Sequence, residues 1–204
     1  MTIVIIIITV VISILAFYRD GIMSRLLFNP YQVFHRKEIY RLITHGFLHA
    51  DWIHLAINMI VLYSFGRNVE AWMGLLKRDG LVNNPILLYG ILYFGGIIIS
   101  SLITLFRHRN NVHYNSVGAS GAVSAVIFTS IFFSPLDRIY FFGVLPIPGI
   151  LFAVLYLIYS SYMSRKSADN INHDAHFAGA VFGFVFPAFI DFRLIEHFLG
   201  SFSF

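Results

Sequence analysis

The stretch VGASGAVSAVIFTSIFFS, residues 117–134, decides the fold class because it runs for nearly the length of a membrane span without a charged side chain. A helix of about 20 mostly apolar residues crosses a hydrocarbon core of ~30 Å. The stretch opens with small residues around a serine, Gly118, Ser120 and Gly121. Since small residues let membrane helices touch, we expect a membrane helix that packs closely against a neighbour.

Outward from this stretch, the rest of the chain repeats the same pattern. Of its 204 residues, 58% are hydrophobic and 12% charged, against roughly 25% charged in soluble domains. Five further windows contain no Asp, Glu, Lys or Arg: 1–18, 52–66, 80–106, 139–164 and 175–190. The sequence therefore predicts an all-α polytopic membrane protein, a bundle of six transmembrane helices that forms a single domain over residues 1–204.

The connections between the expected spans differ in length. Residues 19–50, between the first and second spans, are too polar to cross the membrane but rich in Phe, Tyr and Leu. We expect them to form a long, membrane-associated first loop that lies on or partly in the interface. The fifth span is expected from about Pro146 to Met163, and the sixth from about Ala175 to Ile190.

Composition also excludes several kinds of chemistry. The chain has no cysteine, which excludes disulfides, a thiolate nucleophile and cysteine-ligated metals. Its net charge of +4 comes from basic residues scattered through loops, a pattern that suits anionic lipid headgroups better than nucleic acid. The His-Glu-x-x-His pattern of zinc proteases is missing from the sequence. We expect no metal, no other cofactor and no nucleic-acid partner.

Polar side chains inside membrane spans are costly, and they are candidates for function wherever they occur. Here they gather near the beginnings of three spans: His54 and Asn58 in the second, Ser120 in the fourth and His176 in the sixth. Successive spans alternate in direction, so the second, fourth and sixth begin on the same side of the bilayer. We therefore expect these four side chains to lie at a similar depth.

This combination of residue types suits acyl transfer. Ser120 can act as a nucleophile when a neutral histidine accepts its proton, and His176 is the obvious partner. His54 and Asn58 lie four residues apart on one helical face and can, with the Ser120 backbone N–H, stabilise a developing oxyanion. Asp174 is the only acidic residue near His176 in the sequence. The sequence therefore predicts a Ser-His dyad rather than a triad.

Supporting residues surround this candidate site. Gly118 and Gly121 on one helix, and Gly179 and Gly183 on another, would allow the two backbones to approach closely. His49 is expected to brace the loop that enters the second span.

Each element also has an ordinary structural explanation. A serine in a small-residue helix usually bonds a carbonyl of its own helix, and Asn58 could simply link two helices. His45 is expected to serve loop structure, and His173 to face the surface. It is the joint occurrence of the polar residues at one depth that favours a catalytic site.

With these residues in these spans, the sequence resembles the rhomboid intramembrane serine proteases. Three motifs carry the resemblance: His49-x4-His54-x3-Asn58, Gly118-Ala119-Ser120-Gly121, and Ala175-His176-x2-Gly179-x3-Gly183. Their order, spacing and host spans agree with the family pattern. Tyr40-Arg41 in the first loop and Gly66-x3-Glu70 in the second span add to the match.

The resemblance implies a hydrolase that cleaves peptide bonds in or near transmembrane segments of other proteins, without metal or nucleotide. Ser120 would be the nucleophile and His176 the general base and then acid, while His54, Asn58 and the Ser120 amide would form the oxyanion hole. It further implies cytoplasmic termini, and we expect a prokaryotic inner membrane. The loop charges favour the opposite orientation, with 5 basic residues on the side of the termini and 9 on the other.

One departure and two alternatives accompany this interpretation. Ser124 stands where some family members carry an aromatic residue that stacks on the catalytic histidine. The first alternative is a rhomboid-like protein that binds client proteins without cleaving them. The second is a channel or small transporter that uses His49, His54 and His176 along a path.

Overall fold

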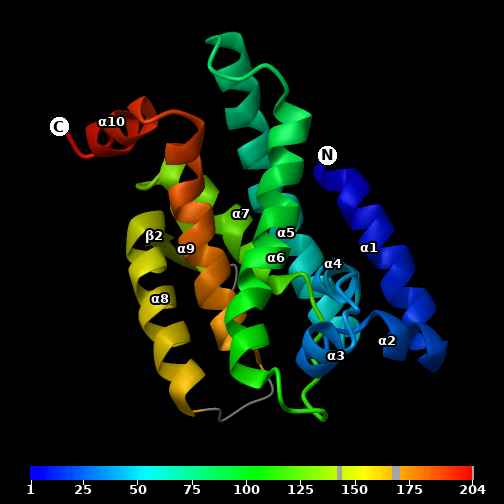
Figure 1. The fold of residues 1–204 in the computed structure, drawn as a ribbon. Coiled ribbons are helices and arrows are strands. Elements are labelled where there is room, and N and C mark those ends of the chain that lie inside the picture. The colour runs from blue at the N-terminus through cyan, green and yellow to red at the C-terminus, as the bar shows by residue number, and fades with distance from the viewer. Residues whose placement is uncertain (142–143, 167–170, 204) are drawn as a thin grey trace.

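Helices dominate the structure, a computed structural model that describes residues 1–141, 144–166 and 171–203. The longer helices are α1 (Thr2–Phe17), α5 (Trp52–Arg78), α6 (Pro85–His108), α7 (Ser120–Phe133), α8 (Gly149–Lys166) and α9 (His173–Ile190). The shorter ones are α2 (Asp20–Leu26), α3 (Pro30–His35), α4 (Arg41–Thr44), the 3-10 helix η1 (His45–Phe47) and α10 (Arg193–Gly200). Both termini lie at one end of the bundle, and α9 begins at the opposite end (Figure 1).

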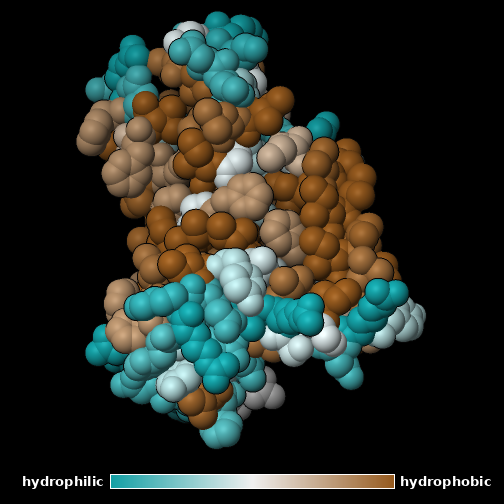
Figure 2. Space-filling view, turned by 45° about the vertical axis from the view of Figure 1, so that its right-hand side comes forward, coloured by the Kyte–Doolittle hydropathy of each residue, from teal (hydrophilic) through white to brown (hydrophobic). Residues whose placement is uncertain are grey.

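The surface is divided as a membrane protein requires, with a band of apolar side chains between two hydrophilic ends (Figure 2). In the described ranges, two helices are both long and apolar enough to cross a bilayer, α6 with 24 residues and α9 with 18. Two other apolar helices, α1 and α7, are shorter, with 16 and 14 residues. Helix length and composition alone therefore do not establish the expected six spans.

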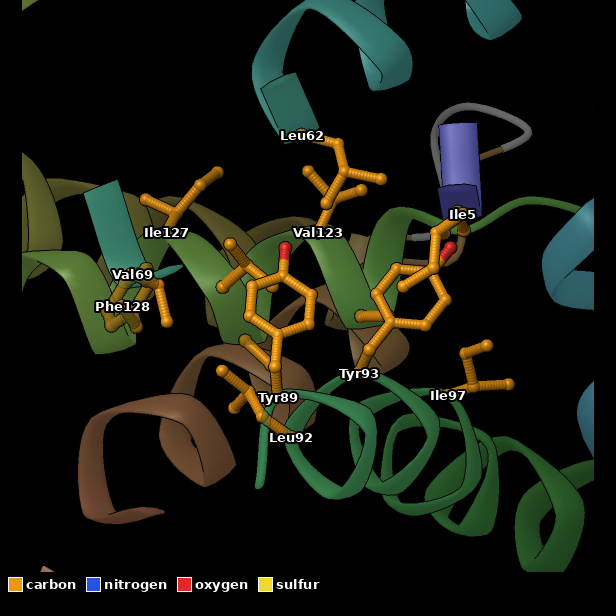
Figure 3. Close-up of a cluster of buried hydrophobic side chains, with 14 of the residues drawn as sticks. Ile5, Leu62, Val69, Tyr89, Leu92, Tyr93, Ile97, Val123, Ile127 and Phe128 are labelled. Atoms are coloured by element: carbon orange, nitrogen blue, oxygen red, sulfur yellow. The ribbon is translucent and has the colours of Figure 1, made fainter. Parts of the chain in front are cut away.

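Helix α7 forms the centre of the bundle. Every one of its residues from Gly121 to Phe133 is buried, and it packs against α5, α6 and α9. Figure 3 shows α7 side chains meeting those of α5, α6 and α1, among them Val123, Ile127, Phe128, Leu62, Tyr89, Tyr93 and Ile5. A helix that is apolar all round is typical of such a central position.

Helices α7 and α9 make backbone contact, and glycines allow it. A Cβ atom on Gly179 would lie 2.1 Å from the carbonyl oxygen of Gly121, and one on Gly183 would lie 2.0 Å from that of Ala125. Both contacts advance by four residues on each helix, so the two helices run parallel in a fixed register. Of all pairs of elements in the described residues, α7 and α9 share the most extensive contact.

The first loop is folded rather than extended, and a buried arginine organises it. Arg41 is only 5% exposed. Its guanidinium donates to the carbonyls of Leu27 at 2.8 Å and Ser24 at 3.0 Å, and it pairs with Glu38 at 2.6 Å. A buried cation is tolerated when its donors are satisfied in this way. Arg41 therefore ties the short helices of the loop together.

The fifth span was expected to begin at about Pro146, but that residue lies in a short strand that precedes the helix. The strands β1 (Arg138–Phe141) and β2 (Leu145–Pro148) form an antiparallel hairpin, and α8 begins only at Gly149. Pro146 pairs with Tyr140, and Pro148 with Arg138. Proline lacks an N–H and disfavours the helical conformation in the residue before it, so the Pro-Ile-Pro segment stays extended. The chain is thus mostly helical with one small hairpin, not wholly α.

Candidate active site

The beginnings of α5 and α9 are fixed by side-chain caps. The Asp51 carboxylate accepts the backbone N–H of His54 at 2.7 Å, and the Asn172 side chain accepts that of Ala175 at 3.1 Å. Asn172 also accepts the hydroxyl of Thr104, from α6, at 3.0 Å. Capping satisfies N–H groups that a helix cannot pair internally. The starts of α5 and α9, which carry His54 and His176, are therefore held in place.

Ser120 is the first residue of α7, and Gly118 shapes the turn before it. Gly118 has φ +126°, a left-handed conformation that L side chains rarely adopt. Its N–H donates to the carbonyl of His45 at 3.1 Å, which joins this turn to the first loop. Ser120 itself is partly exposed, while the residues that follow it in α7 are buried. The hydroxyl thus lies at the entrance of the central helix.

His54 and Ser120 border the same small space beside Gly118. A Cβ placed on Gly118 would lie 2.9 Å from Cε1 and 3.1 Å from Nε2 of His54, and 3.8 Å from Oγ of Ser120. Nδ1 of His54 accepts the Ala50 N–H at 3.4 Å, so Nε2 carries the proton in the neutral ring. The structure therefore places an N–H donor of His54 next to the backbone that precedes the Ser120 hydroxyl.

Asn58 lies one turn further along α5 and is 7% exposed. Its Nδ2 group donates to the carbonyl of His54 at 2.9 Å. A side-chain amide has two N–H donors, so this bond uses one of them. The second donor can serve an acceptor on the same face of the helix as His54.

His176 lies near the beginning of α9, in the first turn. A Cβ on Gly121 would lie 3.4 Å from the carbonyl oxygen of Ala175, so the first turn of α9, which carries His176, packs beside the first turn of α7, which begins at Ser120. His176 and Ser120 are both partly exposed. The two residues are therefore carried by helices in direct contact, at the same end of the bundle.

His49 is fully buried between the loop and α1. Its Nδ1 lies 3.0 Å from the hydroxyl of Ser13, and that hydroxyl donates to the Phe47 carbonyl at 2.8 Å. The His49 ring meets that of His54 edge-on at 4.9 Å between centroids. Burial, and next the neighbouring His54, lower the pKa of His49 to about 3, against the opposing effect of Asp51. His49 is thus neutral and connects the start of α5 to α1.

Two histidines that the sequence reasoning set aside lie close to the candidate site. His45 is 6% exposed, its Nδ1 donates to the Arg41 carbonyl at 2.7 Å, and burial lowers its pKa to about 4. His173, expected at the surface, is 4% exposed, and its ring lies 5.9 Å from that of His176. That expectation was wrong because α9 begins at His173, so the helix turns this ring inward.

Sequence reasoning also missed the aromatic neighbour of His176. Tyr156 of α8 places its ring over the His176 ring, with centroids 6.3 Å apart and planes 21° apart. Its hydroxyl lies 2.7 Å from that of Ser124 on α7.

Asp174 is bound by Arg107 of α6 and Ser164 of α8, which direct its carboxylate to those helices. Within the described part of the chain, no three His, Asp or Glu side chains come together as a metal site.

The apolar band and the polar helix starts define a helical membrane protein whose candidate residues lie at one end of its bundle. A family profile for the rhomboid domain matches residues 36–192, which is more than half of the chain. The chain belongs to the rhomboid family, and it is a membrane protein. This confirms the resemblance that the motifs indicated.

Relatives from a plant and an animal match over most of this chain. RHOMBOID-like protein 12, mitochondrial, of Arabidopsis thaliana is 28% identical over 72% of this chain and 45% of its own length. Rhomboid-like protein 11, chloroplastic, of the same plant is 30% identical over 72% and 50%. Rhomboid-related protein 1 of Caenorhabditis elegans is 28% identical over 79% and 43%.

The chain spans about half the length of these curated relatives or less. The plant relatives are named for the mitochondrion and the chloroplast, so they lend no support to the expected prokaryotic inner membrane.

Proposed function

We propose that the protein is an intramembrane serine endopeptidase that cleaves peptide bonds in or near transmembrane segments of other membrane proteins. The observation that supports this most strongly is the shared space beside Gly118, which His54 Nε2 and Ser120 Oγ both border. Membership of the rhomboid family adds to it.

In the proposed mechanism, Ser120 Oγ attacks the scissile carbonyl while His176 takes the hydroxyl proton. The carbonyl oxygen gains negative charge, and it would be stabilised by the N–H groups of His54 Nε2, Asn58 Nδ2 and the Ser120 backbone. His176 then gives the proton to the leaving amine, which leaves an acyl-enzyme. A water molecule, deprotonated by His176, hydrolyses that ester. No metal or other cofactor takes part in any of these steps.

We further propose that one domain of six spans, α1 and α5 to α9, surrounds this site. The apolar band of Figure 2 supports it. Helix α7, with 14 residues, is too short for a ~30 Å hydrocarbon core, but its residues from Gly121 to Phe133 are buried in protein. A helix enclosed by protein does not need to match the bilayer. The termini would lie on the cytoplasmic side, opposite the site.

The substrate must change shape to react. A transmembrane helix hides its carbonyls in hydrogen bonds, so it has to unwind before Ser120 can reach one of them. Segments with Gly or Pro near the cut suit this role, since both residues destabilise a helix. Ala favours a helix and would suit the cut only through its small side chain. Hydrolysis also needs water, which fits a site at the polar beginnings of helices rather than at mid-membrane.

Purified protein in liposomes with a model transmembrane substrate tests the proposal. Wild type should cut the substrate, and Ser120→Ala or His176→Ala should lower kcat by roughly 10⁴-fold or more. Ser64, exposed on α5 and bonded to its own helix, offers a control, and Ser64→Ala should cleave like wild type. Substrate binding without cleavage by wild type would favour the client-binding alternative and overturn the proposal.

A further inference from the structure

Helix α8 contributes a tyrosine to the surroundings of the candidate base. Ser124 lies four residues after Ser120 and therefore on the same face of α7. The Ser124 hydroxyl is 2.7 Å from that of Tyr156, and the Tyr156 ring lies offset over the His176 ring at 6.3 Å. One side chain thus connects three helices, about one turn inside the bundle from the candidate nucleophile.

The position of Tyr156 is notable because α8 is otherwise weakly attached to the centre. Among its residues only Gly149, Ala153 and Ser160 are buried, and half of its apolar side chains are exposed. It packs mainly on α9 and makes few contacts with α7. The hydrogen bond between Ser124 and Tyr156 is therefore a main link from α8 to the central helix.

We propose that Tyr156 is a positioning residue for His176, held in place by the Ser124 hydroxyl; this rests on the proposed protease function. An aromatic ring against one face of an imidazole restricts the rotation of that ring about its side-chain bonds. The hydroxyl bond then fixes the tyrosine, because a hydrogen bond in a low-dielectric interior is strong and costly to break. Together they hold the imidazole ready to face Ser120.

The small size of Ser124 is part of the arrangement. A large side chain at position 124 would occupy the space that the Tyr156 hydroxyl reaches across. Serine leaves room for the ring and supplies the partner for its O–H, which would otherwise be an unsatisfied polar group in an apolar interior. Residue 124 on α7 and residue 156 on α8 therefore act as a pair.

Steady-state cleavage by four variants tests the pair. Tyr156→Leu removes both the stack and the hydrogen bond, so kcat should fall by about 10- to 100-fold while KM changes less than about twofold. Tyr156→Phe and Ser124→Ala each remove only the hydrogen bond and should lower kcat by about threefold. The double variant Tyr156→Leu with Ser124→Tyr places a ring beside His176 from α7 and should recover most of the lost kcat.

Two controls separate positioning from folding. Tyr162, an exposed tyrosine on the same helix, gives Tyr162→Leu, which should keep the kcat of wild type. Each variant is also followed by thermal unfolding in detergent. If Tyr156→Leu does not fold, Ser124→Ala carries the test, because it leaves the tyrosine and the packing in place.

The outcomes distinguish this inference from the proposed function. Cleavage by wild type that Ser120→Ala abolishes, together with a kcat of Tyr156→Leu (or of Ser124→Ala, where Tyr156→Leu does not fold) equal to that of wild type, overturns the positioning role alone. A rise in KM without a loss of kcat overturns it as well. Absence of cleavage by wild type overturns the proposed function, and the positioning role with it.

Discussion

The contact between α7 and α9 gives a sharp prediction, since it is made of backbone atoms that cannot swing aside. In Gly183→Ala, the new Cβ would lie 2.0 Å from the carbonyl oxygen of Ala125 and 2.5 Å from its Cα. An ordinary contact of this kind is 3.4 Å or more. The helices must therefore separate by at least about 1 Å, and forced overpacking of this size costs about 1–3 kcal/mol of stability.

The same displacement should affect activity, because α9 carries His176 and α7 carries Ser120. A misplacement of about 1 Å can cost about 100-fold in rate. We therefore expect Gly183→Ala to unfold at a lower temperature in detergent, followed by circular dichroism, and to cleave a model substrate about 100-fold more slowly.

A matched control removes the general effect of replacing a helical glycine. Gly74 lies on the exposed side of α5, and a Cβ there would meet nothing within 4 Å. Because alanine favours helix more than glycine, Gly74→Ala should stabilise the protein by about 0.5–1 kcal/mol and leave its activity unchanged. Equal stability and activity of Gly183→Ala and Gly74→Ala would refute the close backbone contact.

Three further predictions concern the loop and the helix starts. His45 stays neutral in the folded protein down to about pH 4, whereas in the unfolded chain it binds a proton near pH 6.5. Its contribution to the free energy of unfolding is therefore fully present above pH 6.5 and is lost as the pH falls toward 4. The loss should reach about 3 kcal/mol. The unfolding temperature, measured at a series of pH values, should therefore fall with pH, and it should fall less steeply in His45→Asn. Gly118→Ala strains a left-handed backbone and pushes on His54, so both stability and cleavage should fall; wild-type values for both would contradict the tight turn. Asn58→Ala should lower kcat by about 100-fold with little change in KM, and an unchanged kcat would remove Asn58 from the oxyanion hole.

Hydropathy predicted the helices well where charge and proline mark their limits. Pro85, preceded by the capping Asn84, begins α6 inside the uncharged window 80–106, and α6 continues to His108, just past the first charged residue after that window, Arg107. Hydropathy gave the wrong element at Pro146, because a short apolar run is compatible with either a strand or a helix and only the two prolines argue against a helix. Hydropathy also did not predict that the first loop is folded, because Ser24 and Leu27, whose carbonyls bind Arg41, lie more than ten residues from it in the sequence.

The sequence predicted how far along their helices the candidate residues lie, but not how each helix is rotated about its own axis. Hydropathy and direction placed His54, Ser120 and His176 near the beginnings of their helices, and the family resemblance assigned their roles. The rotation of a helix about its axis depends on packing, which a single sequence does not reveal. For this reason the sequence did not predict that Tyr156 faces His176, or that His173 is buried.

The proposed chemistry depends most directly on whether Ser120 is activated by His176. A fluorophosphonate probe, which reacts with activated serines, measures this in the purified membrane protein without any substrate. We predict that the probe labels wild type at Ser120, that His176→Ala abolishes labelling while the protein stays folded, and that Ser64→Ala labels like wild type. Absence of labelling in folded wild type, or undiminished labelling of Ser120 in His176→Ala, would contradict the proposed dyad.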